Sequence, residues 1–225
     1  MTKLQILNRE IVACELCPRL RDHGREVARV KRRAYRDWDY WGKPVPSFGD
    51  PKARVLIVGL APGAHGSNRT GRMFTGDKSG DILFWALHAN GFASQVESSS
   101  SADGLVLKDL WITAAAHCAP PDNKPLPEEF AACQPFLKRE LAILRPQLRV
   151  VVALGKLAAD AYLGILKDQG EIASRAPYGF GHGVEHALGP TLLCSYHPSQ
   201  QNTSTGRLTR EMLWAIFARA RALAG

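Results

Sequence analysis

The chain lacks any uncharged apolar run of about 18 residues, the length that a membrane-spanning helix requires. Its N-terminus, MTKLQILNREIVACELC, carries charges throughout and lacks the continuous apolar region of a signal peptide. Acidic residues are also few, 21 against 29 Lys and Arg, so the formal net charge is +8. We therefore expect a cytoplasmic protein with no membrane partner, and the charge favours a polyanionic ligand.

A glycine-rich loop, GLAPGAHGSNRTGRMFTGDKSGD at residues 59–81, lacks the lysine of a P-loop and the spaced glycines of G-x-G-x-x-G. These absences argue against a nucleotide-dependent hydrolase. The loop follows the apolar run ARVLIVGL, and a glycine-rich loop after a strand surrounds an anion with backbone N–H groups. It carries His65, Phe74 and Asp77 instead of the phosphate lysine, and the loop alone leaves its ligand open.

Alternating strand and helix patterns predict a single-domain α/β protein, with three αβα layers around a mostly parallel four-stranded sheet. The expected strands are 55–59, 110–115, 150–155 and 191–195, and the expected helices are 80–90, 127–144, 156–166 and 208–223. Pro135 should kink or split the second helix. The domain spans residues 1–225, with 1–40 as a basic N-terminal segment. Loops 61–81, 117–124 and 196–206 each follow a strand and should meet at one edge of the sheet.

Four arginines of the N-terminal segment recur every four residues: Arg21, Arg25, Arg29 and Arg33. On a helix this spacing aligns them along one face. Two interpretations remain open, a solvated helix face and a stripe that contacts phosphates.

Five cysteines in a cytosolic chain indicate a metal site or reactivity rather than disulfides. Cys194 lies in the apolar run TLLCSY and is expected to be a buried small hydrophobe. Cys14 and Cys17 form a C-x-x-C pair, and Cys118 and Cys133 complete a candidate set of four thiolates. The spacing alone leaves zinc, an iron–sulfur cluster and no metal as alternatives. Either metal would fasten the N-terminal segment, which otherwise has little apolar content, to the domain.

Three motifs in order, GLAPGAHGSNRTGRMFTGDKSGD, CAPPDNKPLPEE and SYHPSQQNTSTGRLT, resemble those of a family 5 uracil-DNA glycosylase (UDGb type). The resemblance implies a 4Fe–4S cluster on the four cysteines. It also implies a monomeric DNA repair enzyme, bound to the nucleoid when on DNA, that removes uracil and other deaminated bases such as hypoxanthine to leave an abasic site. The alternative is a non-catalytic iron–sulfur module that binds nucleic acid. That alternative gives no reason for Asp77, Asn123 and His197 to follow strand ends.

A glycosylase flips the nucleotide into a pocket, which needs a flat face for the base and polar groups for its edge. Phe74 is the candidate stacking face, although a core aromatic is the plain alternative. Asn123 has an amide with both donor and acceptor, which suits the N3–H and O4 edge of uracil, but turn residues of this type are common. The expected base-binding set also includes Gly59, Ala61, Gly63 and His65.

Bond cleavage leaves negative charge on the departing base, and a donor aimed at its oxygen stabilises that charge. His197 is expected to be this donor. Related enzymes place a polar residue where this chain has Ala61, so Asp77 is the candidate that orients water and stabilises the sugar cation. Asp77 precedes a helix, where a capping role is the alternative. The expected catalytic set is therefore Asp77, His197 and Asn123. The residue that fills the vacated duplex is left open among Gln200, Gln201 and Leu208.

Overall fold

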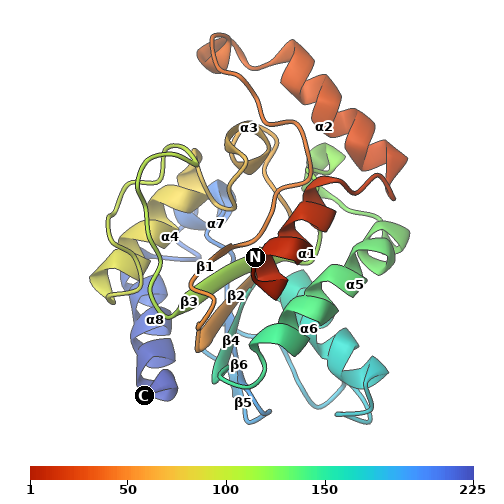
Figure 1. Ribbon diagram of the computed structural model, residues 1–225. Helices are drawn as coiled ribbons and strands as arrows, with labels where there is room; N and C mark the ends of the chain where they lie inside the picture. The colour runs from red at the N-terminus through yellow and green to blue at the C-terminus, as the bar shows by residue number, and fades with distance from the viewer.

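A computed structural model describes residues 1–225 around one six-stranded sheet with the order β1-β3-β2-β4-β6-β5 (Figure 1). The strands are β1 (Phe48–Gly49), β2 (Val55–Gly59), β3 (Leu110–Ala114), β4 (Val150–Leu154), β5 (Glu185–His186) and β6 (Thr191–Ser195). The four central strands are parallel, and they are the four predicted from the sequence. The expected count of four is corrected to six by β1 and β5, two-residue antiparallel strands at the two edges.

Helices cover both faces of the sheet, as its buried central strands require. The helices are α1 (Lys3–Val12), α2 (Pro18–Val30), α3 (Ser67–Thr70), α4 (Lys78–Ala89), α5 (Pro127–Leu144), α6 (Lys156–Asp168), α7 (Gln200–Ser204) and α8 (Arg210–Ala224), with short 3-10 turns η1 (Arg33–Tyr35) and η2 (Pro121–Asn123). Apolar residues of α4 and α8 form one core cluster, and those of α1, α5 and α6 form the other. Figure 1 shows these two groups on opposite sides of the sheet, which confirms the layered α/β architecture. None of the helices combines the length and the apolar character needed to cross a membrane.

The four predicted helices are present as α4, α5, α6 and α8. Pro135 lies inside α5 and does not split it, so that part of the expectation is wrong. The helix on either side of Pro135 buries Leu137, Leu141 and Leu144 against the sheet, and this packing holds the helix together.

The N-terminal segment is attached to the domain by its own packing, contrary to the expectation that it has little to bury. Leu4, Leu7 and Ile11 of α1 are each at most 3% exposed. Asn8 exchanges two hydrogen bonds with the backbone of Ser47, at 2.7 and 3.1 Å. These contacts place α1 beside α5.

The loop between α4 and β3 is tied down by a buried ion pair. Arg72 lies 2.6 Å from Asp103, and both side chains are less than 10% exposed. Burial raises the pKa of Asp103, but hydrogen bonds from Arg72 and from three backbone N–H groups outweigh it and lower that pKa to about 2. Ser98 Oγ and Thr75 Oγ1 are 2.8 Å apart beside this pair. The loop is thereby fixed next to the glycine-rich loop that follows β2.

Candidate functional site

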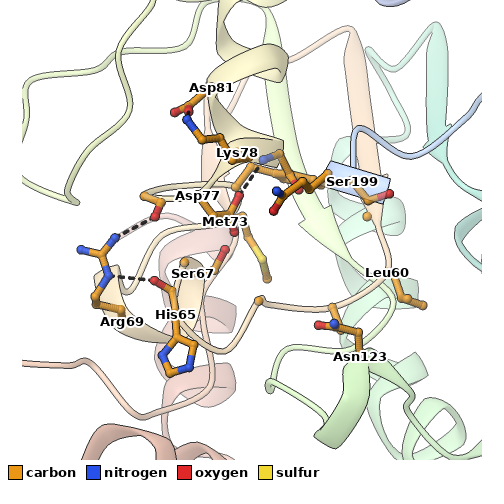
Figure 2. A pocket seen from close by; sticks show the side chains of 18 of the residues that line it. Leu60, His65, Ser67, Arg69, Met73, Asp77, Lys78, Asp81, Asn123 and Ser199 are labelled. Atoms are coloured by element: carbon orange, nitrogen blue, oxygen red, sulfur yellow. Dashed lines mark hydrogen bonds and ion pairs between the residues drawn. The ribbon is translucent and has the colours of Figure 1, made fainter. Parts of the chain in front are cut away.

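A cavity of about 1250 Å³ opens at the carboxyl ends of β2, β3 and β6 (Figure 2). Its walls come from the loop after β2, the first turn of α4, residues 122–124 and residues 197–201. All three loops expected at this edge therefore meet here, because the carboxyl ends of parallel strands share one edge of the sheet. Every residue of the expected catalytic and base-binding sets lines this cavity.

Asp77 uses its two carboxylate oxygens differently. Oδ1 accepts hydrogen bonds from the backbone N–H groups of Ser79 at 3.0 Å and Gly80 at 3.1 Å, which makes Asp77 the N-cap of α4. Oδ2 has no hydrogen-bond partner and lies against the glycine-rich loop, where a Cβ on Gly66 would be 2.0 Å from it and one on Gly63 3.0 Å. The capping alternative is thus correct for one oxygen and leaves the other free.

Burial raises the pKa of Asp77, and the charge of Asp81 acts in the same direction. The two capping N–H groups and the positive charge of Arg69 oppose this rise. The carboxyl therefore ionises less readily than that of an exposed Asp, and the carboxylate is correspondingly the stronger base.

His197 follows β6 and is held by its backbone, since its carbonyl accepts a 2.8 Å hydrogen bond from the side chain of Asn202. Its ring makes no hydrogen bond within the protein. Burial lowers the pKa of His197 to about 4, so the imidazole is neutral at pH 7. A neutral imidazole still carries one N–H, which is available to donate to a negatively charged oxygen in the cavity.

Phe74 has a backbone conformation that bulky residues rarely adopt, with φ 53°. Two glycines make room for it: a Cβ on Gly59 would lie 2.9 Å from its ring, and one on Gly80 would lie 1.9 Å from its carbonyl oxygen. The ring centre is 5.8 Å from that of His197, with the planes 33° apart. Phe74 belongs to the core cluster and also lines the cavity, so the two interpretations of this residue are compatible.

Asn123 approaches the cavity from η2, on a different segment from Asp77 (Figure 2). Asn123 and Asp122 both have positive φ, at 56° and 53°, a conformation in which Asn and Asp are favoured over other side chains. Asn123 is exposed, and its side-chain amide makes no hydrogen bond with the protein. Both its donor and its acceptor are therefore available to a ligand.

The remaining expected residues lie along the glycine-rich loop. The carbonyl of Gly63 accepts from the N–H of Asn68 at 3.0 Å, which turns the loop into α3. His65 Nδ1 is 3.1 Å from the hydroxyl of Tyr40, so its ring is engaged with the N-terminal segment. Burial and neighbouring positive charges lower the pKa of His65. Ala61 contributes only a methyl group to the wall.

Of the three residues left open for filling the duplex, one is excluded. Leu208 is 1% exposed in the core and unable to reach DNA. Gln200 and Gln201 are exposed at the start of α7 and line the cavity. Ser199 caps this helix by accepting from the N–H of Asn202.

The four-arginine stripe does not exist as one free face. Arg21 is 4% exposed and donates to the carbonyl of Gly42 at 3.2 Å. Arg25 pairs with Glu15, and Arg29 pairs with Glu26, one turn earlier on α2. Arg33 lies beyond the end of α2. The paired arginines of α2 therefore fit the solvated-face interpretation.

Arg32, Tyr35 and Trp38 form a further wall of the cavity that was not expected from the sequence. The guanidinium of Arg69 lies 3.9 Å from the ring centre of Tyr35 and 4.2 Å from that of Trp38. Aromatic residues among cations, in RRAYRDWDYW, were a signal for this wall, because this combination is typical of nucleic-acid binding surfaces.

The four candidate cysteine ligands line a second, smaller cavity between α2 and α5, while Cys194 is buried in the core as expected. The Sγ of Cys133 accepts from the N–H of His117 at 3.3 Å. Burial raises the pKa of the Cys118 thiol to about 12 and also raises those of Cys17 and Cys133. No three Cys, His, Asp or Glu side chains converge closely enough to hold one metal ion. The four cysteines nevertheless line this one cavity from three separate segments of the chain.

Comparisons with known proteins agree with this geometry. Residues 46–221 match the model of the uracil DNA glycosylase superfamily. The chain is 51% identical to a Type-5 uracil-DNA glycosylase of Mycobacterium leprae, over 97% of this chain and 95% of the relative. It is 50% identical to a Type-5 uracil-DNA glycosylase of Thermus thermophilus, over 96% and 95%.

A more distant relative, a Type-4 uracil-DNA glycosylase of Pyrobaculum aerophilum, is 30% identical over 87% of this chain and 83% of its own length. The family match covers the whole sheet from β1 onward and all the strand-end loops that build the cavity. On both grounds, this chain belongs to the uracil DNA glycosylase superfamily.

Proposed function

We propose that this protein is a uracil-DNA glycosylase that hydrolyses the N-glycosidic bond of a flipped-out nucleotide and leaves an abasic site. One observation carries the proposal: a single cavity at the strand ends joins an aromatic face, a free carboxylate oxygen, a neutral imidazole and an unengaged amide. The names of the relatives support it. We also propose that the enzyme acts as a monomer on the cell's DNA.

The cavity suits an extruded nucleotide. Its volume of about 1250 Å³ exceeds that of a typical small-molecule pocket, as a base with its sugar and flanking phosphates requires. The ring of Phe74, which lines the cavity, provides a stacking face. The amide of Asn123 is free to bond the polar edge of the base.

The chemistry divides between two side chains on opposite sides of the scissile bond. Cleavage moves an electron pair onto the base, and the N–H of neutral His197 stabilises the oxygen that gains this charge. Oδ2 of Asp77 orients the attacking water and stabilises the positive charge on the sugar. Gly66 and Gly63 lack the Cβ atoms that would displace Oδ2 from this position.

We further propose that other deaminated bases, hypoxanthine among them, are substrates. Ala61 adds no polar group that selects one base. The amide of Asn123 has no partner that fixes its orientation, so it is able to present oxygen or nitrogen as the base demands. A site with these two features discriminates weakly between bases.

For the second cavity we propose a 4Fe–4S cluster held by Cys14, Cys17, Cys118 and Cys133. Support comes from the donor set, since four cysteine thiolates are the ligands of such a cluster and all four line one cavity. When bound, the cluster would link α2, the end of β3 and α5 through metal–thiolate bonds. Its role is structural, and no step of excision depends on it.

Excision is tested by incubating excess protein with a duplex that contains one uracil and treating the product with alkali. Strand breaks at the uracil position are expected, and a duplex with hypoxanthine at that position should also be cut. An otherwise identical duplex with thymine is the control. Binding to the uracil duplex without breaks would favour the non-catalytic module and contradict the proposal.

A further inference from the structure

The chain after α2 contains four cations that no carboxylate neutralises. Lys31, Arg32, Arg33 and Arg36 are absent from every ion pair of the protein, and the three arginines are exposed. Asp37 and Asp39 follow in the same stretch, and they form no ion pair with these cations either. We call residues 31–38 the basic arm. Cations without ion-pair partners are available to an anionic ligand, because no carboxylate has to be displaced first.

The exposed arginines of α2 differ from those of the arm, because each has a carboxylate partner, and Arg19 lies 2.7 Å from Glu129. Arg25 lies 2.6 Å from Glu15, and Arg29 lies 2.6 Å from Glu26. A phosphate would have to displace these carboxylates before it could bind. The nearby arm offers the same side-chain type without that competition.

The basic arm is fastened to the loop that carries Asp77. Arg69 inserts its guanidinium against the rings of Tyr35 and Trp38, at 3.9 and 4.2 Å from their centres. The same guanidinium donates to the carbonyl of His65 at 2.8 Å (Figure 2) and to that of Gly76 at 2.7 Å. Arg69 is 3% exposed, so it holds the arm in place and does not itself reach a ligand.

The arm also reaches the site, because Arg32, Tyr35 and Trp38 line the same cavity as Asp77. Trp38 remains 39% exposed although one part of its ring covers Arg69. An exposed aromatic next to free cations is the combination that binds a nucleic-acid strand, through stacking and phosphate contacts together.

We infer that the basic arm binds the damaged DNA strand beside the flipped nucleotide, with Arg32 and Arg33 on its phosphates and Trp38 stacked on an adjacent base. The arginines of α2 take no part. This inference deepens the proposed function and rests on it.

The test compares two double variants of equal charge. Arg32→Ala with Arg33→Ala and Arg25→Ala with Arg29→Ala each remove two positive charges. Binding of the full-length protein to an undamaged duplex is measured over a range of salt concentrations. The arm variant should flatten the slope of log K against log salt by about 1.8, because each phosphate contact contributes about 0.9. The α2 variant should keep the parent slope. Equal slopes for the two variants would overturn the inference.

Trp38 is tested separately by its affinity for a single-stranded oligonucleotide. Trp38→Ala should weaken binding about five- to 150-fold with an unchanged salt slope, and Trp38→Phe should retain most of the affinity. Parent-like affinity of a folded Trp38→Ala protein would remove the stacking contact. Uracil excision by the parent, measured in the same preparations, tests the proposed function independently, since it does not depend on which surface binds the strand.

Discussion

Asp77→Asn separates the two oxygens of a side chain that serves both as a helix cap and as the candidate catalytic carboxylate. Asparagine keeps Oδ1, so the hydrogen bonds from Ser79 and Gly80 remain. It replaces Oδ2, the oxygen beside Gly66, by an NH₂ group of nearly the same size. The substitution therefore removes the charge and leaves the cap.

Its effect on stability follows from the direction of the pKa shift. The pKa of Asp77 is raised in the folded state, so the side chain stabilises the fold while it is protonated, below its unfolded pKa. This contribution is lost as the pH rises through the folded pKa. At pH 7 the ionised carboxyl is the less favourable form, and Asn caps a helix about as well as Asp. The melting temperature of Asp77→Asn should therefore equal or exceed that of the parent.

Activity should change in the opposite direction. Proton-transfer groups of this kind contribute about 10²–10⁴ to a rate, and we expect Asp77→Asn to lower single-turnover excision of uracil by at least about tenfold. The parent rate should also fall as acid protonates Asp77, starting above the pKa of an exposed Asp. The variant should lack that pH dependence.

The measurement is single-turnover excision between pH 5 and 8, with thermal unfolding of the same samples. Asp81→Asn is the matched control, because Asp81 lies one turn along α4, is exposed and pairs only with Lys78 at 3.5 Å. At pH 7 it should excise at the parent rate, and its loss of activity in acid should move to lower pH, because the charge of Asp81 no longer raises the pKa of Asp77. A stable Asp77→Asn protein that also excises at the parent rate, with the parent pH profile, would refute the catalytic assignment and leave Asp77 as a cap.

Three further predictions concern other parts of the molecule. His197→Ala should slow excision by about 10²–10³ and leave DNA affinity unchanged, because the lost donor acts on charge that develops during cleavage; single-turnover rates within threefold of the parent would contradict this. Protein purified anaerobically should be yellow-brown and contain iron, and Cys118→Ala should lose both the colour and the iron; stoichiometric zinc without iron in the parent would exclude the cluster. Arg72→Met should lower the free energy of unfolding at pH 7 by about 3–5 kcal/mol, since it leaves the carboxylate of Asp103 buried without its partner. The free energy of unfolding of the parent should also fall by about 2 kcal/mol as the pH drops from the unfolded pKa of Asp103, near 3.8, through its folded value of about 2, because protonation removes the stabilising charge of Asp103. Denaturant titrations that detect no pH-dependent difference between Arg72→Met and the parent would contradict both statements.

The central sheet was predictable because its strands are continuous apolar runs, as in β2 and β4, and buried parallel strands need no other signal. The edge strands β1 and β5 have two residues each, too few for any periodicity. The position of the cavity followed from strand direction alone. Regular local patterns thus fixed the frame and the place of the site.

The side-chain arrangement of the site depended on contacts between distant segments, which no local pattern records. Arg21 has the same spacing as Arg25, yet only Arg21 meets the carbonyl of Gly42 and becomes buried. From the sequence, Asp77 was a candidate for either a helix cap or a catalytic group. Its side chain caps α4 with one oxygen and keeps the other beside the loop only because Gly66 has no Cβ. The attachment of Trp38 depends on Arg69, more than thirty residues away in sequence.

The close approach of Phe74 to α4 limits how this enzyme is made more heat-resistant. Replacing a glycine inside a helix by alanine commonly stabilises a protein by about 0.4–1 kcal/mol, where the new methyl group fits. At Gly164 in α6 that methyl would meet only the side chain of Gln134, at 3.9 Å, and the gain should be realised. At Gly80 it would lie 1.9 Å from the carbonyl oxygen of Phe74 and displace the segment that presents the ring to the cavity. Thermostabilising libraries should therefore sample alanine at Gly164 and keep glycine at Gly80, and screens of such libraries should score uracil excision alongside melting temperature.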